Sequence, residues 1–275
     1  MSLEKRMSER MVEWGFPGSG FLLSLSRYGT CRDSESLSQL RESAAIVVPE
    51  FIDCIGFEQN NFHHDSDVAL HIARSVSVMD SVPYTVICEG FEPLMFAIAL
   101  HDIAKPDSYT EKDGVGHFYG HAEKSADKAA MIAARIGLKE KDVDLLYKLV
   151  RNHDIDITVS SRHSKNNPDR VHRIAEDIVK TLIRKKGYSS QEVMYEALML
   201  GCDALAQNHE TISEKIDITN SVMDIIEEKM REEGHYCIPP SVRFTMDGPV
   251  MLDEFRRMGI YEQEPVVSSS DDDAR

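Results

Sequence analysis

A histidine and an aspartate stand side by side, as His101 and Asp102, directly after a run of seven apolar residues at positions 94–100. A bare carboxylate on an apolar helix is costly to bury without a cation or a paired partner. An imidazole and a carboxylate hold a divalent ion only when other helices bring further ligands. His71 and Asp203 are candidates, because each lies on an apolar stretch of its own. The order His, His-Asp, Asp therefore predicts a buried metal site.

Hydrophobic periodicity predicts helices throughout the chain, and no comparable alternating strand pattern is present. Leu94, Ile98, His101 and Lys105 share one helical face between Pro93 in a first turn and Pro106, which is expected to end the helix. Glycine-rich residues 107–120 are expected to form a loop that closes over a site. Five further helices are predicted. One carries His71, and another carries Asp203 and begins with a Ser189/Glu192 capping box. The other three cover residues 139–153, the stretch from Pro168 to Gly187, and residues 212–230. The expected fold class is all-α, a helical bundle.

Composition limits the classes of function. With 31 basic and 47 acidic residues the chain has a formal net charge of -16, which opposes non-specific binding along nucleic acid. No apolar run is long enough to cross a bilayer and the first residues lack a signal-peptide core, so a soluble, cytoplasmic protein without membrane contact is expected. Five cysteines without close pairs argue against a disulfide framework or a thiolate zinc site.

One segment departs from the acidic composition. Residues 162–186 contain eight basic and three acidic residues. Such a segment can form a positive rim that attracts phosphate esters, or make a local contact with RNA. A solvated helix face is an equally good interpretation for its distal part, Arg184, Lys185 and Lys186.

The four-residue pattern resembles the HD superfamily of metal-dependent phosphohydrolases. Residues 48–71, 100–106, 118–122 and 149–153 also follow, in order, the blocks of the HD domain of bacterial CCA-adding tRNA nucleotidyltransferases. The likeness covers residues 45–207 well and 246–260 weakly. It implies an HD helical bundle over residues 45–235, preceded by a helical extension at 1–44 and followed by a C-terminal segment at 236–275 with a disordered acidic tail.

Two further histidines fit the resemblance. His121 follows the glycine-rich segment, and His153 ends the predicted helix before Asp154. HD proteins with the order His, His-Asp, His, His, Asp hold a second ion with such residues, and Asp102 would then bridge the two ions. The alternative is that His121 and His153 contact a substrate phosphate directly.

The resemblance stops at the nucleotidyltransferase head. The family's head needs Gly-Gly, Arg-Asp and a strand with paired carboxylates. Residues 29–33 match this pattern only weakly, and no strand with paired carboxylates follows them. CCA addition is therefore not expected of this chain. What remains resembles phosphohydrolases that act on nucleotide-type phosphomonoesters and cyclic phosphodiesters.

The expected activity is metal-dependent hydrolysis of a phosphate ester. His71, His101, Asp102 and Asp203 would hold an ion that activates water. Lys105 would stabilise charge on the phosphate, or else be a cation at a helix C-terminus. Imidazole-rich ligation favours manganese, iron, cobalt, nickel or zinc over magnesium alone.

Three alternatives fit the same residues. The first is a regulatory or RNA-associated binding module that kept the ligands for stability. The second is a hydrolase of cyclic dinucleotides or dinucleoside polyphosphates. The third is an HD-fold oxygenase with a di-iron site. Substrate, metal and oligomeric state are not fixed by the sequence.

Overall fold

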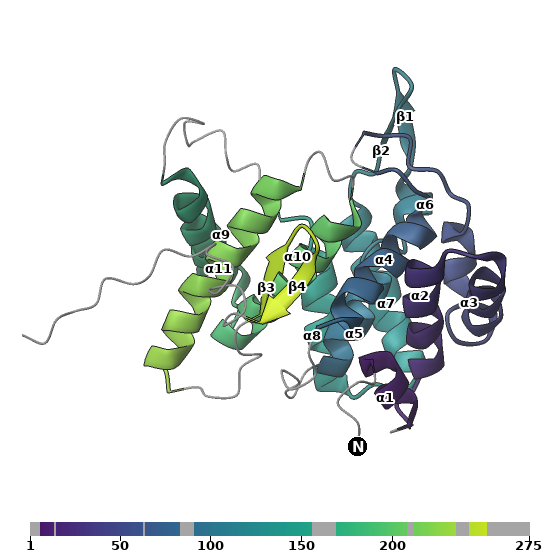
Figure 1. Cartoon of the computed structure of the whole chain (residues 1–275), viewed down its shortest axis with the longest axis horizontal. Coiled ribbons are helices and arrows are strands. Elements are labelled where there is room, and N and C mark those ends of the chain that lie inside the picture. The colour runs from purple at the N-terminus through teal and green to yellow at the C-terminus, as the bar shows by residue number, and fades with distance from the viewer. Residues whose placement is uncertain are drawn as a thin grey trace, which may run out of the picture.

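The computed structural model describes residues 6–13, 15–62, 64–82, 91–155, 169–207, 212–234 and 242–251. Helices account for most of these residues, and strands form only two short hairpins (Figure 1). The predicted all-α helical bundle is confirmed.

The helices are joined mostly by short connections. In chain order the elements are α1 (Met7–Glu13), α2 (Ser19–Cys31), α3 (Ser34–Val47), the 3₁₀ helix η1 (Pro49–Cys54), α4 (Val68–Asp80), α5 (Phe91–Leu100), α6 (Lys105–Ser108), β1 (Thr110–Lys112), β2 (Val115–His117), α7 (His121–Arg135), α8 (Glu140–Asn152), α9 (Arg170–Lys186), α10 (Ser190–Ala206), α11 (Ser213–Glu232), β3 (Val242–Thr245) and β4 (Gly248–Met251).

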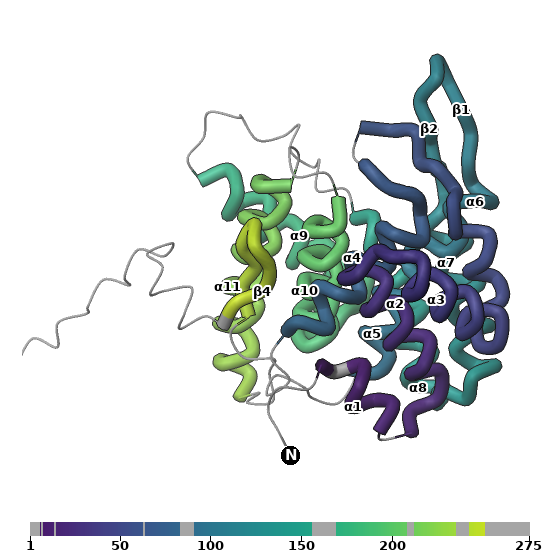
Figure 2. The backbone as a smooth tube through the Cα atoms, turned by 45° about the vertical axis from the view of Figure 1, so that its right-hand side comes forward, coloured from purple at the N-terminus to yellow at the C-terminus, as the bar shows by residue number. Residues whose placement is uncertain are grey.

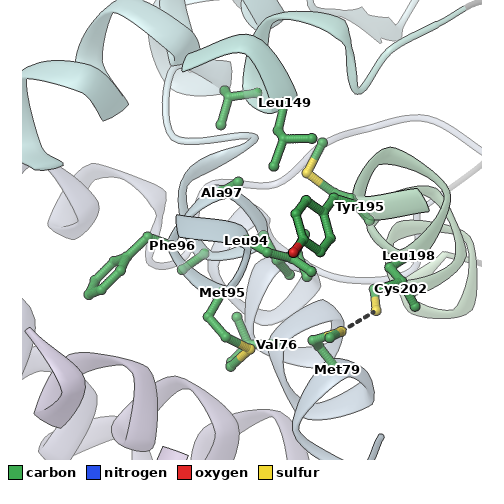
Figure 3. Close-up of a cluster of buried hydrophobic side chains, with 14 of the residues drawn as sticks. Val76, Met79, Leu94, Met95, Phe96, Ala97, Leu149, Tyr195, Leu198 and Cys202 are labelled. Atoms are coloured by element: carbon green, nitrogen blue, oxygen red, sulfur yellow. Dashed lines mark hydrogen bonds between the residues drawn. The ribbon is translucent and has the colours of Figure 1, made fainter. Parts of the chain in front are cut away.

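The centre of the molecule is formed by α4, α5, α8 and α10, among which α5 and α10 each pack against the other three. Figure 3 shows their shared core, to which α5 contributes an almost uninterrupted apolar surface. The thiol of Cys202 on α10 lies 3.9 Å from the sulfur of Met79 on α4. Each of these four helices carries, or is directly followed by, one of the predicted ligands. The apolar core therefore sets the distances within the site.

Further elements cover this centre on two sides (Figures 1 and 2). On one side α2 packs closely on α4: a methyl group added at Gly29 would lie 2.2 Å from the carbonyl oxygen of Ala73. On the other side α11 packs on α10, with α9 and the β3–β4 hairpin against α11. Arg243 on β3 is buried and pairs with Asp224 and Glu227 of α11, which fixes that hairpin to the bundle.

The helix that leads to the His-Asp pair is shorter than predicted. It was expected to continue through Lys105 to Pro106, but α5 ends at Leu100, and residues 101–104 form a turn. Pro106 lies in the first turn of a separate helix, α6. A proline is tolerated there, whereas inside a continuous helix its ring would clash with the carbonyl of Asp102. His101 and Asp102 consequently lie in a turn that frees their side chains from a single helix face.

One prediction about local structure was wrong, and a second hairpin had no signal in the sequence. Residues 107–120, expected to be a loop, contain the antiparallel β1–β2 hairpin, and residues 242–251 contain β3–β4. These strands have three or four residues each, too few to give an alternating pattern. The expected helices at residues 139–153, 168–187 and 212–230 are present as α8, α9 and α11, and the Ser189/Glu192 capping box is formed.

Several predictions lie outside the described residues: the acidic tail, Cys88, Cys237, and the basic residues Arg162 and Lys165. The division at residues 44/45 and 235/236 stays a prediction. Among the described residues no helix is both long enough and apolar enough to cross a membrane.

A buried carboxyl group on α10 is held in its protonated form. The side chain of Glu196 is fully buried, and Oε2 lies 2.9 Å from the hydroxyl of Tyr188. That hydroxyl donates to the carbonyl of Lys148 and accepts from the amide of Asn152. The hydroxyl has one proton for two acceptors, the carbonyl of Lys148 and Oε2 of Glu196, and a protonated Glu196 satisfies both contacts by donating to Tyr188. Burial raises the pKa of Glu196 to about 8.

We expect Glu196→Gln to change how stability depends on pH. Because the folded-state pKa is raised, the folded chain binds a proton that the unfolded chain releases above about pH 4.5, so wild-type stability falls as pH rises towards 8. The amide keeps the donor to Tyr188 without titrating. At pH 9 the variant should be more stable than wild type by a few kcal/mol, at about 1.4 kcal/mol per pKa unit, and nearly equal at pH 4.5.

Urea unfolding across this pH range measures the difference. Glu228→Gln, at an exposed position of α11, is the matched control and should show no such trend. A variant less stable than wild type at both pH values would contradict a neutral Glu196.

Candidate metal centre

The first member of the site, His71, is set by the start of α4. Asp67 caps this helix by accepting a hydrogen bond from the backbone N–H of Leu70 at 2.7 Å, which places His71 in the second helical turn. The imidazole is fully buried. Its Nδ1 lies 3.4 Å from the carbonyl oxygen of Ala206 at the end of α10, so Nε2 faces the centre of the bundle.

His101 and Asp102 enter the same space from the turn after α5. Nδ1 of His101 lies 2.8 Å from the carbonyl oxygen of Ile98. Its Nε2 lies 3.3 Å from Nε2 of His71, and Oδ2 of Asp102 lies 3.2 Å from both of these nitrogens. Both side chains are almost completely buried.

Asp203 closes this group from α10. Its Oδ1 lies 2.9 Å from Nε2 of His71 and 3.5 Å from Nε2 of His101. The structure thus brings together the four residues that the sequence singled out, with their ligand atoms all within 4.8 Å of one another. Donors about 2.1 Å from one ion lie about 3 Å apart in octahedral or tetrahedral geometry, which is the spacing observed.

His121 and His153 form a second group with Asp102. His121 begins α7 and His153 caps α8, and their Nε2 atoms are 3.2 Å apart. These nitrogens lie 3.2 and 3.5 Å from Oδ1 of Asp102. The two oxygens of one carboxylate therefore face two different sets of imidazoles.

The protonation of the four imidazoles indicates a cation site. Each Nδ1 lies beside a backbone carbonyl, which can only accept, so each Nδ1 carries a proton. In the neutral ring the lone pair of Nε2 then points at the carboxylates and at another Nε2. Oδ1 of Asp102 is buried and receives no hydrogen bond from the described residues. Such converging lone pairs repel one another unless protons or metal ions lie between them.

The charges support the same conclusion. Burial alone would raise the pKa of Asp102 and Asp203. Lys105, His101 and His121 outweigh it at Asp102, and His101 and His71 outweigh it at Asp203, so both pKa values lie well below the ordinary range. Burial alone would lower the pKa of His101, but Asp102 and Asp203 raise it to about 10. Burial lowers the pKa of His153. The first group therefore combines two carboxylates with a proton that a metal ion can displace.

Lys105 is part of this charge arrangement. Its ammonium lies 2.6 Å from Oδ2 of Asp102 and donates to Oε1 of Gln59 at 2.8 Å. It stands at the start of α6. The alternative in which it is a cation at the C-terminus of a long helix is therefore wrong, because that helix ends five residues earlier.

A cavity of about 530 Å³ opens onto the two groups. Asp102, Lys105, His121, His153 and Asp203 reach it, together with residues that the sequence interpretation missed: Asn61, Phe62, His64, Gln207 and Lys215. The basic residues described on α9 do not line it. The ammonium groups that line the cavity are those of Lys105 and Lys215, while Arg162 and Lys165 of the predicted rim lie outside the described residues.

Gln207 and Lys215 continue the site from Asp203. The amide of Gln207 donates to Oδ2 of Asp203 at 2.9 Å, and its Oε1 accepts from Lys215 at 2.6 Å. Oδ2 is thereby occupied, and only Oδ1 of Asp203 faces the histidines. No sequence signal marked these residues. Gln207 lies just after α10 and Lys215 lies in the first turn of α11, so no helical spacing relates them to Asp203 as a group.

His64 lies beside the first group. Its ring packs edge-on against His71 with centroids 4.6 Å apart, and its Nδ1 is buried without a hydrogen bond from the described residues. Burial lowers its pKa, and Lys105 lowers it further. A neutral imidazole therefore borders the cavity next to the predicted ligands.

Comparison with known proteins supports the resemblance seen in the sequence. The chain is 33% identical over 129 residues to a multifunctional CCA protein of Aromatoleum aromaticum, a match that covers 45% of this chain and 29% of the relative. It is 26% identical over 155 residues to a bifunctional uridylyltransferase/uridylyl-removing enzyme of Caulobacter vibrioides, covering 51% of this chain and 15% of the relative. No known family profile matches the chain.

This chain is partly homologous to both relatives. The buried histidine and aspartate cluster agrees with an HD motif. The chain spans less than a third of the length of each of these relatives. The match therefore does not show that this chain has the complete activities of these two proteins.

We expect Gln207→Ala to weaken metal binding by about tenfold to a hundredfold, because an outer partner that orients a ligand contributes on that scale. Without the amide, Asp203 loses the hydrogen bond that keeps Oδ1 turned towards His71 and His101. Titration of chelator-treated protein with manganese measures the affinity. Gln39→Ala on α3, another glutamine with a side-chain hydrogen bond at i−4, is the control. Unchanged affinity in the Gln207 variant would show that the contact does not orient the ligand.

Proposed function

We propose that this chain is a divalent-metal-dependent phosphohydrolase. His71, His101, Asp102 and Asp203 would hold one ion, and Asp102, His121 and His153 a second. The observation that carries the proposal is the carboxylate of Asp102, whose oxygens face two sets of imidazoles with their Nε2 lone pairs turned inward. The alternative for His121 and His153, direct contact with phosphate, requires a second proton on Nε2, because both Nδ1 protons already face carbonyls, and burial lowers the pKa of His153 and disfavours that charged form.

The nitrogen and oxygen donors favour manganese, iron, cobalt, nickel or zinc over magnesium alone. An ion bound there supplies Lewis acidity and lowers the pKa of a water molecule to near neutrality. The chain supplies the rest. Lys105 lies at the cavity floor beside Asp102 and would donate to a phosphoryl oxygen as negative charge develops. The apolar helices beneath keep bulk water from the ligands.

The substrates we propose are phosphomonoesters or cyclic phosphodiesters of nucleotide type. Two features support this class. The cavity floor carries two ammonium groups, Lys105 and Lys215, that attract a phosphate. One relative is named as a CCA protein and another as a uridylyl-removing enzyme, so both names refer to nucleotides. A local contact with RNA remains part of the proposal, through the exposed basic end of α9 at Arg184, Lys185 and Lys186.

We expect His101→Ala and Asp102→Ala to reduce metal-dependent phosphoester hydrolysis to the background rate. Each removes a buried donor, and loss of Asp102 also leaves Lys105 without its carboxylate. The measurement is turnover of a panel of phosphate esters with added manganese, nickel or magnesium, on variants shown to be folded by circular dichroism. His172→Ala, an exposed histidine on α9 outside the cavity, is the control and should keep full activity. Undiminished turnover in either folded site variant would refute the assignment.

We expect metal content to approach two ions per chain, and His153→Ala to lower it to about one. The second group has only three donors from the described residues, so loss of one leaves too few. Anomalous scattering from manganese-soaked crystals would place the ions. A single peak at His71, His101, Asp102 and Asp203, with metal content unchanged in the variant, would contradict a two-ion site.

A further inference from the structure

The mouth of the cavity differs in chemistry from its floor. Phe62 and Tyr119 both line the cavity and yet have exposed fractions of 69% and 76%. Val115, which is 41% exposed, lines the same cavity. Large apolar side chains at the rim of a cavity are a feature of ligand sites, since water is displaced from them when a ligand binds.

Tyr119 presents a ready-made flat surface. Its ring is stacked on His117 with an interplanar angle of 8° and centroids 5.4 Å apart. Two parallel rings that are already stacked lose little freedom when a third ring is added. A planar heterocycle is the group best matched to such a surface, because every nucleobase has a face that stacks on aromatic side chains.

The rim is tied to the floor by backbone contacts. The N–H of Gly116 on β2 donates to the carbonyl of Asn60 at 2.9 Å. A methyl group added at Gly116 would lie 2.2 Å from the carbonyl oxygen of Gln59, so the two segments touch at a point that only glycine allows. Gln59 in turn accepts from Lys105. The segment before Phe62 and the hairpin before Tyr119 are thus held at a set position relative to Lys105.

Floor and mouth together define the shape of a ligand. The floor holds Lys105, Lys215 and the proposed metal ligands, which suit an anion, whereas the mouth offers aromatic faces. A volume of about 530 Å³ lies within the range of roughly 300–1,000 Å³ found for small-molecule sites. A phosphate at the floor with a base at the mouth satisfies both parts, while a phosphate or sugar phosphate alone would leave the aromatic side chains in water.

We infer that Phe62 and the stacked pair Tyr119/His117 form a base-binding subsite that selects nucleoside phosphates over sugar phosphates. The inference rests on the proposed function for the site at which the phosphate reacts. Phe62 and Tyr119 determine specificity through the base and do not touch the reacting phosphate.

Adenosine 5′-phosphate and ribose 5-phosphate are a matched pair of probes, because they bear the same phosphomonoester and differ only in the base. We expect wild-type protein with manganese to show a lower KM for the nucleotide. Tyr119→Ala and Phe62→Ala should each raise that KM about fivefold or more, given the usual strength of stacking, while kcat and the KM for ribose 5-phosphate stay unchanged. Met131→Ala, a side chain 65% exposed on α7 outside the cavity, should change neither substrate.

Binding is measured separately by saturation-transfer NMR on chelator-treated protein. The adenine protons should receive magnetisation from wild-type protein and less from Tyr119→Ala. Equal KM values for the two probes, or equal changes for both in the variants, would overturn the subsite. If no phosphoester is hydrolysed with any metal, the proposed function fails, and the NMR result alone decides: transfer that depends on Tyr119 upholds the subsite, and absence of transfer overturns it.

Discussion

The buried carboxylate of Asp102 is the group on which the arrangement of the site depends. It lies among four imidazoles and one ammonium, and its ionised form is held by Lys105 and His101. Leaving such a charge in an apolar interior without partners costs several kcal/mol, so every neighbour has to be placed accurately. Placement comes from backbone carbonyl groups. Those of Ile98 and Val150 in the last turns of α5 and α8, and that of Phe118 just before α7, each accept from Nδ1 of the histidine three residues further along the chain. This i to i−3 contact turns Nε2 of His101, His121 and His153 inward in the same way.

The hydrophobic core explains why these helix ends meet. The apolar faces of α4, α5, α8 and α10 pack into one cluster, and the ligands lie at its border. Because interiors are close-packed, a shift of one helix would be transmitted to the distance between its ligand and the others. The near-absence of polar residues from α5 follows from this position, since the helix is surrounded and then delivers His101 and Asp102 at its end.

The sequence predicted the content of the site better than its local geometry. Ionisable residues on apolar helices are visible in a linear pattern, and the order of His71, His101, Asp102 and Asp203 added to that signal. The turn at residues 101–104 was missed because helical spacing continues through Lys105, and only the three-dimensional position of Pro106 shows that the helix restarts. Gln207 and Lys215 were missed for another reason: they act through contacts across a connection, and nothing in their own spacing indicates a partner.

The hairpin β1–β2 shows how a feature that looks like a loop in sequence becomes part of a site. Its glycines suggested a loop, but Gly116 is needed because any larger residue would clash with the carbonyl oxygen of Gln59. The glycine therefore fixes the hairpin close to this segment. The same contact joins the rim to Lys105 through Gln59, and Lys105 joins Gln59 to Asp102. One continuous set of polar contacts therefore runs from the hairpin to the carboxylate between the two imidazole groups. This short path fixes the position of the mouth relative to the predicted metal ligands. A ligand that binds at the mouth would therefore have its phosphate oriented at the floor.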